Sequence, residues 1–259
     1  MNVLFLTLAR ISDIEERGIY TDLMREFVRH GHTMYIVVPA ERRFHQSTEL
    51  LDDGNVKILR VWTFNIQKTN LIEKGIGTLL LEYQYQKAIQ KYWRNVKFGL
   101  VLYSTPPITF NKIIATMKKK DAKTYLLLKD IFPQNAVDLG MFSKGSFFYR
   151  MFRKKEERLY QLSDYIGCMS PANVDYVLRH NREVDIRRVE VCPNSIELCK
   201  AEEQACPKGA LAQKLNIPTD KILFIYGGNL GRPQGLDFLI EVLAANEKRN
   251  DSFFIIVGS

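Results

Sequence analysis

A charged pair, Lys129 and Asp130, directly follows the short apolar run at residues 125–128. An apolar run of that length predicts a strand buried on both faces. In open α/β sheets, ligands bind at the carboxyl ends of the strands. A carboxylate there can orient a hydroxyl or remove its proton, and a neighbouring cation lowers its pKa. Asp130 is therefore a candidate catalytic group; the structural alternative is an N-cap for a helix after Pro133.

Two further turns carry polar groups that a substrate can contact. Ser104 and Thr105 end the preceding apolar strand pattern, and a glycine-rich turn at residues 227–232 follows a later one. The two hydroxyls either bind substrate hydroxyls or cap a helix. Backbone N–H groups of a glycine-rich turn at a helix start form a natural anion site. The alternative for residues 227–232 is an ordinary strand-to-helix turn without a ligand.

Alternating apolar and amphipathic segments predict the sheet that positions these groups. Strands are predicted at residues 2–9, 34–40, 56–62, 98–104, 124–128, 164–170 and 187–197. Helices are predicted between them, including a long half-buried one over residues 71–93 whose apolar residues include Leu79, Leu80, Tyr83, Ala88 and Tyr92. Such alternation requires a parallel sheet with right-handed crossovers. The expected fold class is α/β, a Rossmann-like doubly wound parallel sheet.

Gly18 stands at the start of the first predicted helix, and Gly31 is the expected residue just past its end. No G-x-G-x-x-G pattern follows the first strand, so a nicotinamide dinucleotide site is disfavoured. Gly18 either contacts a ligand or forms a plain loop-to-helix turn.

The pattern is interrupted once and then restarts. Residues 1–200 form the first expected domain, and the polar segment 201–219, broken by Pro207, Gly209 and Pro218, is the expected linker. Residues 220–259 contain one strand–helix–strand unit. Parallel sheets are buried on both faces, and one such unit cannot cover its own sheet. Either this unit leans on the first domain, or it begins a second domain that is incomplete in this sequence and continues beyond its last residue; we expect the second of these.

Composition limits the partners. The formal charge of +8 suits anionic small molecules or an anionic membrane face. No nucleic-acid-binding motif is present, so nucleic acid is not an expected partner. Four cysteines without C-x-x-C spacing and only four histidines disfavour a zinc site and a disulfide framework. No apolar run approaches the ~20 residues of a membrane span.

A basic aromatic segment follows the predicted active edge. Its candidates for facing a membrane are Phe148, Arg150, Phe152, Arg153 and Lys154. Such a segment can lie on an anionic membrane surface. The alternative is an amphipathic helix that packs its aromatic rings on the sheet and exposes its charges.

Five segments occur in a recognisable order along the chain: YSTPP, LLLKDIFPQNAVDLGM, YIGCMS with VCPNSIE, IYGGNLGRPQGLDFLI, and FFIIVGS. Together they resemble bacterial family-4 glycosyltransferases of capsule, O-antigen and colanic-acid synthesis. The resemblance implies a GT-B fold, in which two Rossmann-like domains face each other across a cleft. It implies retaining transfer without a metal or other cofactor, from a nucleoside diphosphate sugar, expected to be UDP-linked, to a lipid-linked saccharide.

The resemblance also assigns roles. Asp130 would orient or deprotonate the acceptor, at the cytoplasmic face of the cell membrane. The acceptor-binding residues would be Gly18, Ser104, Thr105 and Lys129, and the donor-binding residues Gly228, Asn229, Arg232 and Gln234. Asn194 and Ser195 would form a hinge or contact a ligand. As an incomplete enzyme the chain is expected to be inactive by itself.

Two features depart from the family. The family's Glu-x7-Glu pair is matched in spacing only by Glu41 and Glu49, which lie in the wrong domain. Asn229 and Gln234 replace two basic residues that would neutralise the diphosphate, which leaves Arg232 as a substitute. Alternative functions are a UDP-sugar 2-epimerase of GT-B fold and a non-catalytic module that binds a membrane surface.

Overall fold

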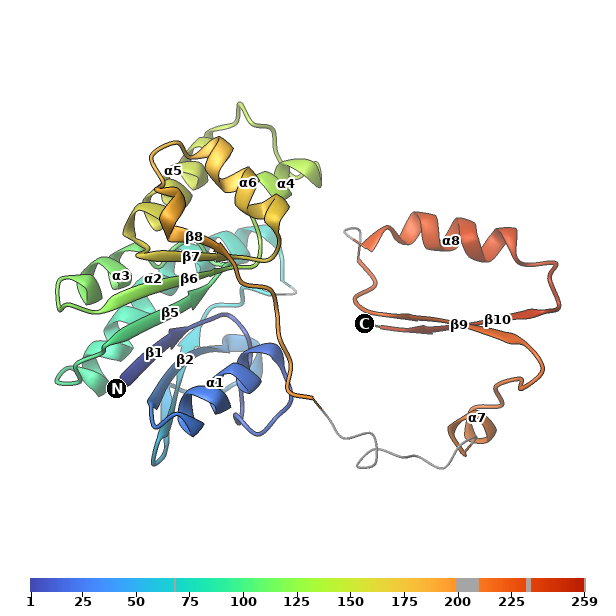
Figure 1. Cartoon of the computed structure of the whole chain (residues 1–259), viewed down its shortest axis with the longest axis horizontal. Coiled ribbons are helices and arrows are strands. Elements are labelled where there is room, and N and C mark those ends of the chain that lie inside the picture. The colour runs from blue at the N-terminus through green and yellow to red at the C-terminus, as the bar shows by residue number, and fades with distance from the viewer. Residues whose placement is uncertain (68, 199–209, 232–233, 259) are drawn as a thin grey trace. The chain divides into compact units, whose positions relative to one another are not determined.

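The computed structural model describes residues 1–67, 69–198, 210–231 and 234–258 (Figure 1). The chain separates into two compact units, Met1–Glu197 and Leu198–Ser259. The predicted linker, 201–219, lies partly outside the described residues. Its described part contains a short helix, α7 (Ala210–Lys214), where no helix was expected.

An eight-stranded sheet forms the larger unit, in the order β3-β4-β2-β1-β5-β6-β7-β8. Its strands are β1 (Asn2–Leu6), β2 (Thr33–Glu41), β3 (Glu49–Asp53), β4 (Val56–Thr63), β5 (Leu100–Ser104), β6 (Lys123–Leu128), β7 (Tyr165–Cys168) and β8 (Val189–Val191). Neighbouring strands pair in parallel, except that β3 is antiparallel to β4. The predicted Rossmann-like α/β fold is confirmed. The sequence did not predict β3, because this edge strand is short and rich in acidic residues.

Strands are added on both sides of β1. The chain first builds outward through β2 and β4, and then returns to place β5 on the other side of β1. The adjacent strands β1 and β5 are therefore the point at which the strand order reverses, where open α/β sheets place their ligand sites. Leu6 pairs with Tyr103 there, so Thr7 and Ser104 follow at the same carboxyl edge.

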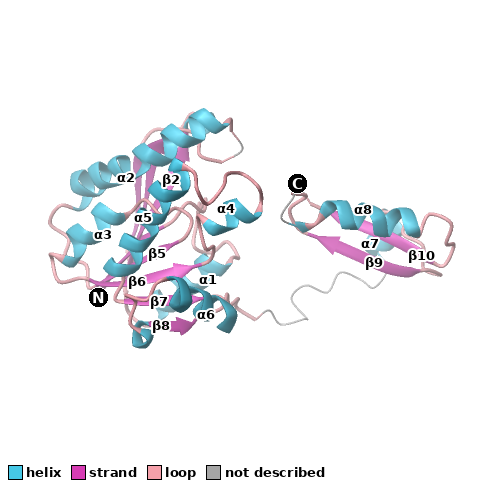
Figure 2. Cartoon of the chain, turned by 90° about the horizontal axis from the view of Figure 1, so that it is seen from above, coloured by secondary structure: helices cyan, strands magenta, loops and turns pink. Residues whose placement is uncertain are grey.

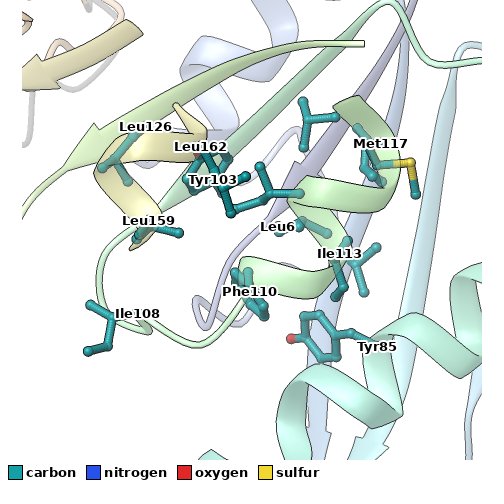
Figure 3. Close-up of a cluster of buried hydrophobic side chains, with 14 of the residues drawn as sticks. Leu6, Tyr85, Tyr103, Ile108, Phe110, Ile113, Met117, Leu126, Leu159 and Leu162 are labelled. Carbon is teal, nitrogen blue, oxygen red and sulfur yellow. The ribbon is translucent and has the colours of Figure 1, made fainter. Parts of the chain in front are cut away.

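Two apolar clusters cover the opposite faces of this sheet. On one face α2 (Leu71–Trp93), α3 (Asn111–Lys118) and α5 (Phe147–Leu162) pack against the strands (Figure 2). Figure 3 shows part of that cluster, including Leu6, Tyr85, Tyr103, Phe110, Ile113, Leu126 and Leu159. On the other face α1 (Ile19–Arg29) contributes Met24, which packs among Val3, Phe5, Met34 and Ile36. The shorter elements are η1 (Arg42–Phe44), α4 (Gln134–Asp138), α6 (Pro171–His180) and η2 (Ile186–Arg188).

The buried face of α2 differs from the prediction. Leu79 and Tyr83 are 56% and 62% exposed, and Leu80 is also exposed. Ala88 is buried and Tyr92 packs against the core, as predicted, and the other residues that enter the core are Leu81, Tyr85, Ile89 and Trp93. Apolar residues occur around most of this helix, so helical spacing alone could not decide which stripe is buried.

The end of α1 was predicted correctly. Gly31 has a positive φ of 75°, a conformation that glycine adopts without steric cost. The N–H of Gly31 donates to the carbonyl of Val28 at 2.9 Å, and the N–H of His32 donates to that of Phe27 at 3.0 Å. These two bonds form a Schellman motif, which ends the helix and turns the chain into β2.

The smaller unit contains two parallel strands, β9 (Ile222–Gly227) and β10 (Ser252–Val257), joined through α8 (Leu236–Ala245). The predicted strand–helix–strand pattern is therefore present. A Cβ on Gly258 would lie 2.1 Å from the carbonyl oxygen of Gly228, so glycine is required where these backbones approach. Among the described residues, no helix is both long and apolar enough to cross a bilayer.

Candidate functional site

Two hydroxyls meet where the strand order reverses. The Oγ1 atom of Thr7, just after β1, lies 3.2 Å from the Oγ atom of Ser104, the last residue of β5. Thr7 also accepts a hydrogen bond from the N–H of Ala9 at 3.1 Å. The hydroxyl of Tyr85 donates to the carbonyl of Thr7 at 2.9 Å. Thr7 and Ser104 are 1% and 2% exposed, so this bond lies beneath the carboxyl edge of the sheet.

Thr105 joins the ends of β5 and β6. Its hydroxyl accepts the N–H of Lys129 at 3.1 Å and donates to the carbonyl of Asp130 at 3.2 Å. Thr105 is as buried as Ser104. Neither residue caps α3, whose N-cap is Phe110. Both predicted roles, binding of an acceptor hydroxyl and helix capping, therefore differ from the structure, where the two hydroxyls are satisfied within the protein and fix the edge.

Asp130 presents an exposed carboxylate at this edge. The alternative role of Asp130 as a helix N-cap is wrong, because α4 begins at Gln134, has Pro133 as its N-cap and has no side-chain cap. Partial burial raises the pKa of Asp130. The sequence predicted a lowered pKa from a neighbouring cation, and this prediction is wrong. In the described part of the chain no ion pair joins Lys129 to Asp130. The side chain of Lys129 is half-buried near Cys192, and this burial lowers the pKa of Lys129.

Tyr20, in the first turn of α1, was not predicted as a site residue. Burial raises the pKa of Tyr20, a hydrogen bond with Ser104 opposes the shift, and the negative charge of Asp130 adds to it. The raised pKa keeps the phenol protonated, and both Ser104 and Asp130 are close enough to influence it. Its ring packs 5.2 Å from that of Phe5. The available signal was its position, in the first helical turn after β1, which the same carboxyl-edge rule places near the site.

Gly18 is the N-cap of α1 and has an extended backbone with a φ of 174°. Its N–H donates to the Oδ1 atom of Asp22 at 3.1 Å. A Cβ at this position would lie 3.2 Å from the Oγ1 atom of Thr21. The loop-to-helix turn thus accounts for the local geometry of Gly18, and a ligand contact stays a prediction.

Asn194 and Ser195 lie in the segment after β8, where the predicted strand 187–197 is paired only over Val189–Val191 in the described structure. Both side chains are exposed. Their predicted hinge role stays a prediction.

The glycine-rich turn of the smaller unit differs from its predicted geometry. The helix α8 begins only at Leu236, after Gly235 in a left-handed conformation, so the described part of the turn, residues 227–231, does not include the helix N-cap. The N–H of Gly228 already donates to the carbonyl of Val257 at 3.0 Å. Asn229 is exposed, and its carbonyl accepts the hydroxyl of Tyr226 at 3.2 Å. Gln234 is exposed, and Arg232 lies outside the described residues.

The basic aromatic segment forms α5, and only part of it has the predicted exposure. Phe148, Arg150 and Lys154 are exposed as predicted. Phe152 instead packs its ring 5.0 Å from that of Phe132 and joins the core. Arg153 is also wrongly predicted, because it pairs with Glu156 and Glu157 and donates to the carbonyl of His180 and the side chain of Asn181.

The described residues contain no group of three or more His, Cys, Asp or Glu side chains that could hold a metal ion.

Comparison with known proteins identifies relatives of this chain. No protein-family model matches it. It is 29% identical over 197 residues to the probable glycosyltransferase WbjE of Pseudomonas aeruginosa, covering 72% of this chain and 46% of that protein. It is 28% identical over 152 residues to the putative colanic acid biosynthesis glycosyl transferase WcaI of Escherichia coli K12, covering 54% of this chain and 35% of that protein. The chain thus spans less than half the length of these relatives.

Solved structures share its fold. The sucrose-phosphate synthase of Thermosynechococcus elongatus superposes with a TM-score of 0.67 at 11% identity, over 100% of this chain and 63% of that one. A UDP-GlcNAc 2-epimerase from Neisseria meningitidis, bound to UDP-GlcNAc, gives a TM-score of 0.57 at 13% identity, over 99% of this chain and 65% of that one. The predicted resemblance to bacterial glycosyltransferases of GT-B fold is confirmed by the sequence relatives and the fold together.

Proposed function

We propose that this chain, a relative of bacterial glycosyltransferases with the GT-B fold, belongs to an enzyme that transfers a sugar with retention from a UDP-linked donor to a lipid-linked saccharide. The observation that carries the proposal is the exposed Asp130 carboxylate at the carboxyl edge, just after β6, which neighbours β5 at the reversal of strand order; its charge influences the Tyr20 phenol. The similarity to WbjE and WcaI supports the same class of reaction.

The chemistry follows from the two groups at this edge. Transfer breaks the bond between the anomeric carbon and the diphosphate, and forms a bond from that carbon to an acceptor oxygen whose proton must leave. The raised pKa makes Asp130 a better proton acceptor than an ordinary aspartate. The protonated phenol of Tyr20 can donate to a neighbouring acceptor hydroxyl and fix its orientation. No metal is assigned to this step.

The donor side of the proposal depends on the smaller unit. Gly228, Asn229 and Gln234 are proposed to line the UDP-sugar site, with Arg232 as the phosphate-binding cation. Because the N–H of Gly228 is already used, the positive charge of Arg232 and the side chains of Asn229 and Gln234 would carry the binding. In the larger unit, Gly18 and Lys129 are proposed to contact the acceptor.

We also propose that the enzyme works at the cytoplasmic face of the membrane and touches it through the start of α5. Phe147 and Phe148 are 70% and 59% exposed. The exposed cations Arg150 and Lys154 follow them on the same helix. Aromatic rings flanked by cations suit the boundary between lipid headgroups and acyl chains of an anionic bilayer.

The second candidate function is epimerisation of a UDP-sugar, which the fold shared with the 2-epimerase favours. Measurement of UDP release by the complete gene product, with and without a lipid-linked saccharide, separates the two functions. Acceptor-dependent release supports transfer. Formation of the 2-epimer of the UDP-sugar without the saccharide, with no acceptor-dependent UDP release, would argue for the epimerase and against the proposal.

A further inference from the structure

The segment that follows β8 is fastened to α1 by its last residue, Glu197, where it runs past that helix (Figure 1). The carboxylate of Glu197 accepts from Arg25 at 3.0 Å and from Arg29 at 2.6 Å. Its backbone N–H donates to the Oδ2 atom of Asp22 at 2.7 Å. Main chain and side chain of one residue are therefore both held by α1.

Asp22 and Arg25 also hold the loop between β1 and α1. The other oxygen of Asp22, Oδ1, accepts the N–H of Gly18 at 3.1 Å. The Nη1 atom of Arg25 donates to the carbonyl of Ile14 and, at 3.2 Å, to that of Glu16. Residues 7–18 contain no helix or strand in the described structure, so these bonds are a main source of their order.

Asp22 and Arg25 bond to each other at 2.5 Å, and each side chain is only 9% exposed. One carboxylate and one guanidinium thus serve the loop and the Glu197 segment at the same time. Buried charged groups need their full set of partners, and hydrogen bonds in such a network strengthen one another. Loss of the bonds from this pair to Glu197 is therefore expected to weaken its bonds to the loop as well.

We propose that Asp22 and Arg25 are positioning residues that make the order of the β1–α1 loop depend on the docking of Glu197. The loop ends at Gly18, two residues before Tyr20. Its conformation therefore sets where the Tyr20 phenol lies relative to Ser104 and Asp130. This last consequence for the acceptor rests on the proposed function, whereas the coupling itself does not.

Hydrogen exchange tests the coupling without any substrate. Glu197→Gln keeps the shape of the side chain and removes its charge, and Arg25→Lys keeps the charge and removes the planar fork. Glu26→Gln is the matched control, because Glu26 lies on α1 and pairs with Arg29 but forms no hydrogen bond or ion pair with the loop or with Glu197 in the described structure. We expect both test variants to speed exchange several-fold in residues 8–18 and in residues 192–197, with β1 and β5 unchanged.

Faster exchange in residues 192–197 alone, with residues 8–18 as in the unsubstituted chain, would overturn the proposal. So would a Glu26→Gln variant that speeds exchange in the loop as much as Glu197→Gln does.

In the complete gene product, Glu197→Gln is expected to raise the KM for the saccharide acceptor and to leave kcat unchanged. A lowered Tm with both kinetic constants unchanged would show a purely structural role. Absence of any sugar transfer would contradict the proposed function but not the coupling.

Discussion

The hydroxyl of Thr7 lies 3.2 Å from that of Ser104, and this bond joins the two strands at which the chain reverses its direction across the sheet. Both residues are almost fully buried. The bond therefore does not contact solvent, and it lies beneath the carboxyl edge at which Asp130 is exposed. The first prediction concerns the stability that this bond contributes.

Ser104→Ala is expected to lower the free energy of unfolding by about 1–3 kcal/mol, because it leaves the buried Thr7 hydroxyl without this partner. Thr7→Val combined with Ser104→Ala is expected to cost less than the sum of the two single changes, since neither of the two hydroxyls is then left behind without the other. Urea unfolding of the four proteins measures the coupling. Strict additivity of the two changes would contradict the bond.

A second prediction concerns pH. Because the pKa of Asp130 is raised, the acid limb of kcat/KM in the complete gene product should lie above the range of an ordinary aspartate, about 4. The carboxylate is the active form, so activity falls as the pH falls through that raised pKa. The same shift means that the folded protein holds this proton more tightly than the unfolded chain. Its contribution to stability therefore decreases as the pH rises through the same range.

Rate profiles from acid to neutral pH test this prediction. An acid limb at the pKa of an ordinary aspartate would contradict the raised pKa of Asp130. The profile of an Asp175→Asn variant, at an exposed site on α6, should match that of the unsubstituted enzyme.

Gly167, in β7, provides a third prediction. A Cβ there would lie 2.5 Å from the hydroxyl of Tyr125 and 2.7 Å from the Cβ of Cys192. Gly167→Ala should therefore destabilise the larger unit by roughly 1–3 kcal/mol through overpacking. Gly75→Ala in α2, where a Cβ meets open space, is the matched control and should be neutral or stabilising. Thermal unfolding that shows equal Tm values for the two variants would contradict the crowding at β7.

The membrane proposal gives a fourth prediction. Replacing Phe147 and Phe148 with serine should reduce flotation with vesicles that contain anionic lipid, because each exposed ring adds apolar area to the bound state. Leu79→Ser, at another exposed apolar residue, is the control and should float normally. Equal loss in both variants would show that exposed apolar area in general, and not the start of α5, binds the vesicles.

The sequence predicted the parallel sheet and the edge that carries Asp130, because apolar runs and the turn residues after them are local signals. The Gly31 helix end was predictable for the same reason, since its two bonds form within one turn. Among the described elements, the sequence did not predict β3, a short acidic edge strand, or α7, a short helix in the expected linker.

The environment of Asp130 was not predictable, because it is tertiary. Adjacency in sequence suggested that Lys129 would lower its pKa, yet the side chain of Lys129 lies near Cys192 instead. Ser104 and Thr105 were correctly placed at the edge. Their buried hydrogen bonds, however, join Ser104 to Thr7 and Thr105 to Lys129, residues that are distant in sequence. Exposure along α5 and α2 likewise depends on packing partners that spacing does not reveal.

The most direct test of the account is sugar transfer to a lipid-linked saccharide by the complete gene product and its Asp130→Asn variant. The variant should fold normally, because the carboxylate is exposed, and should lose about 10²–10⁴-fold in kcat, the usual effect of removing a general base. Asp175→Asn should retain full turnover. If Asp130→Asn turned over sugar at the unsubstituted rate, the carboxylate at this edge would have no part in the chemistry.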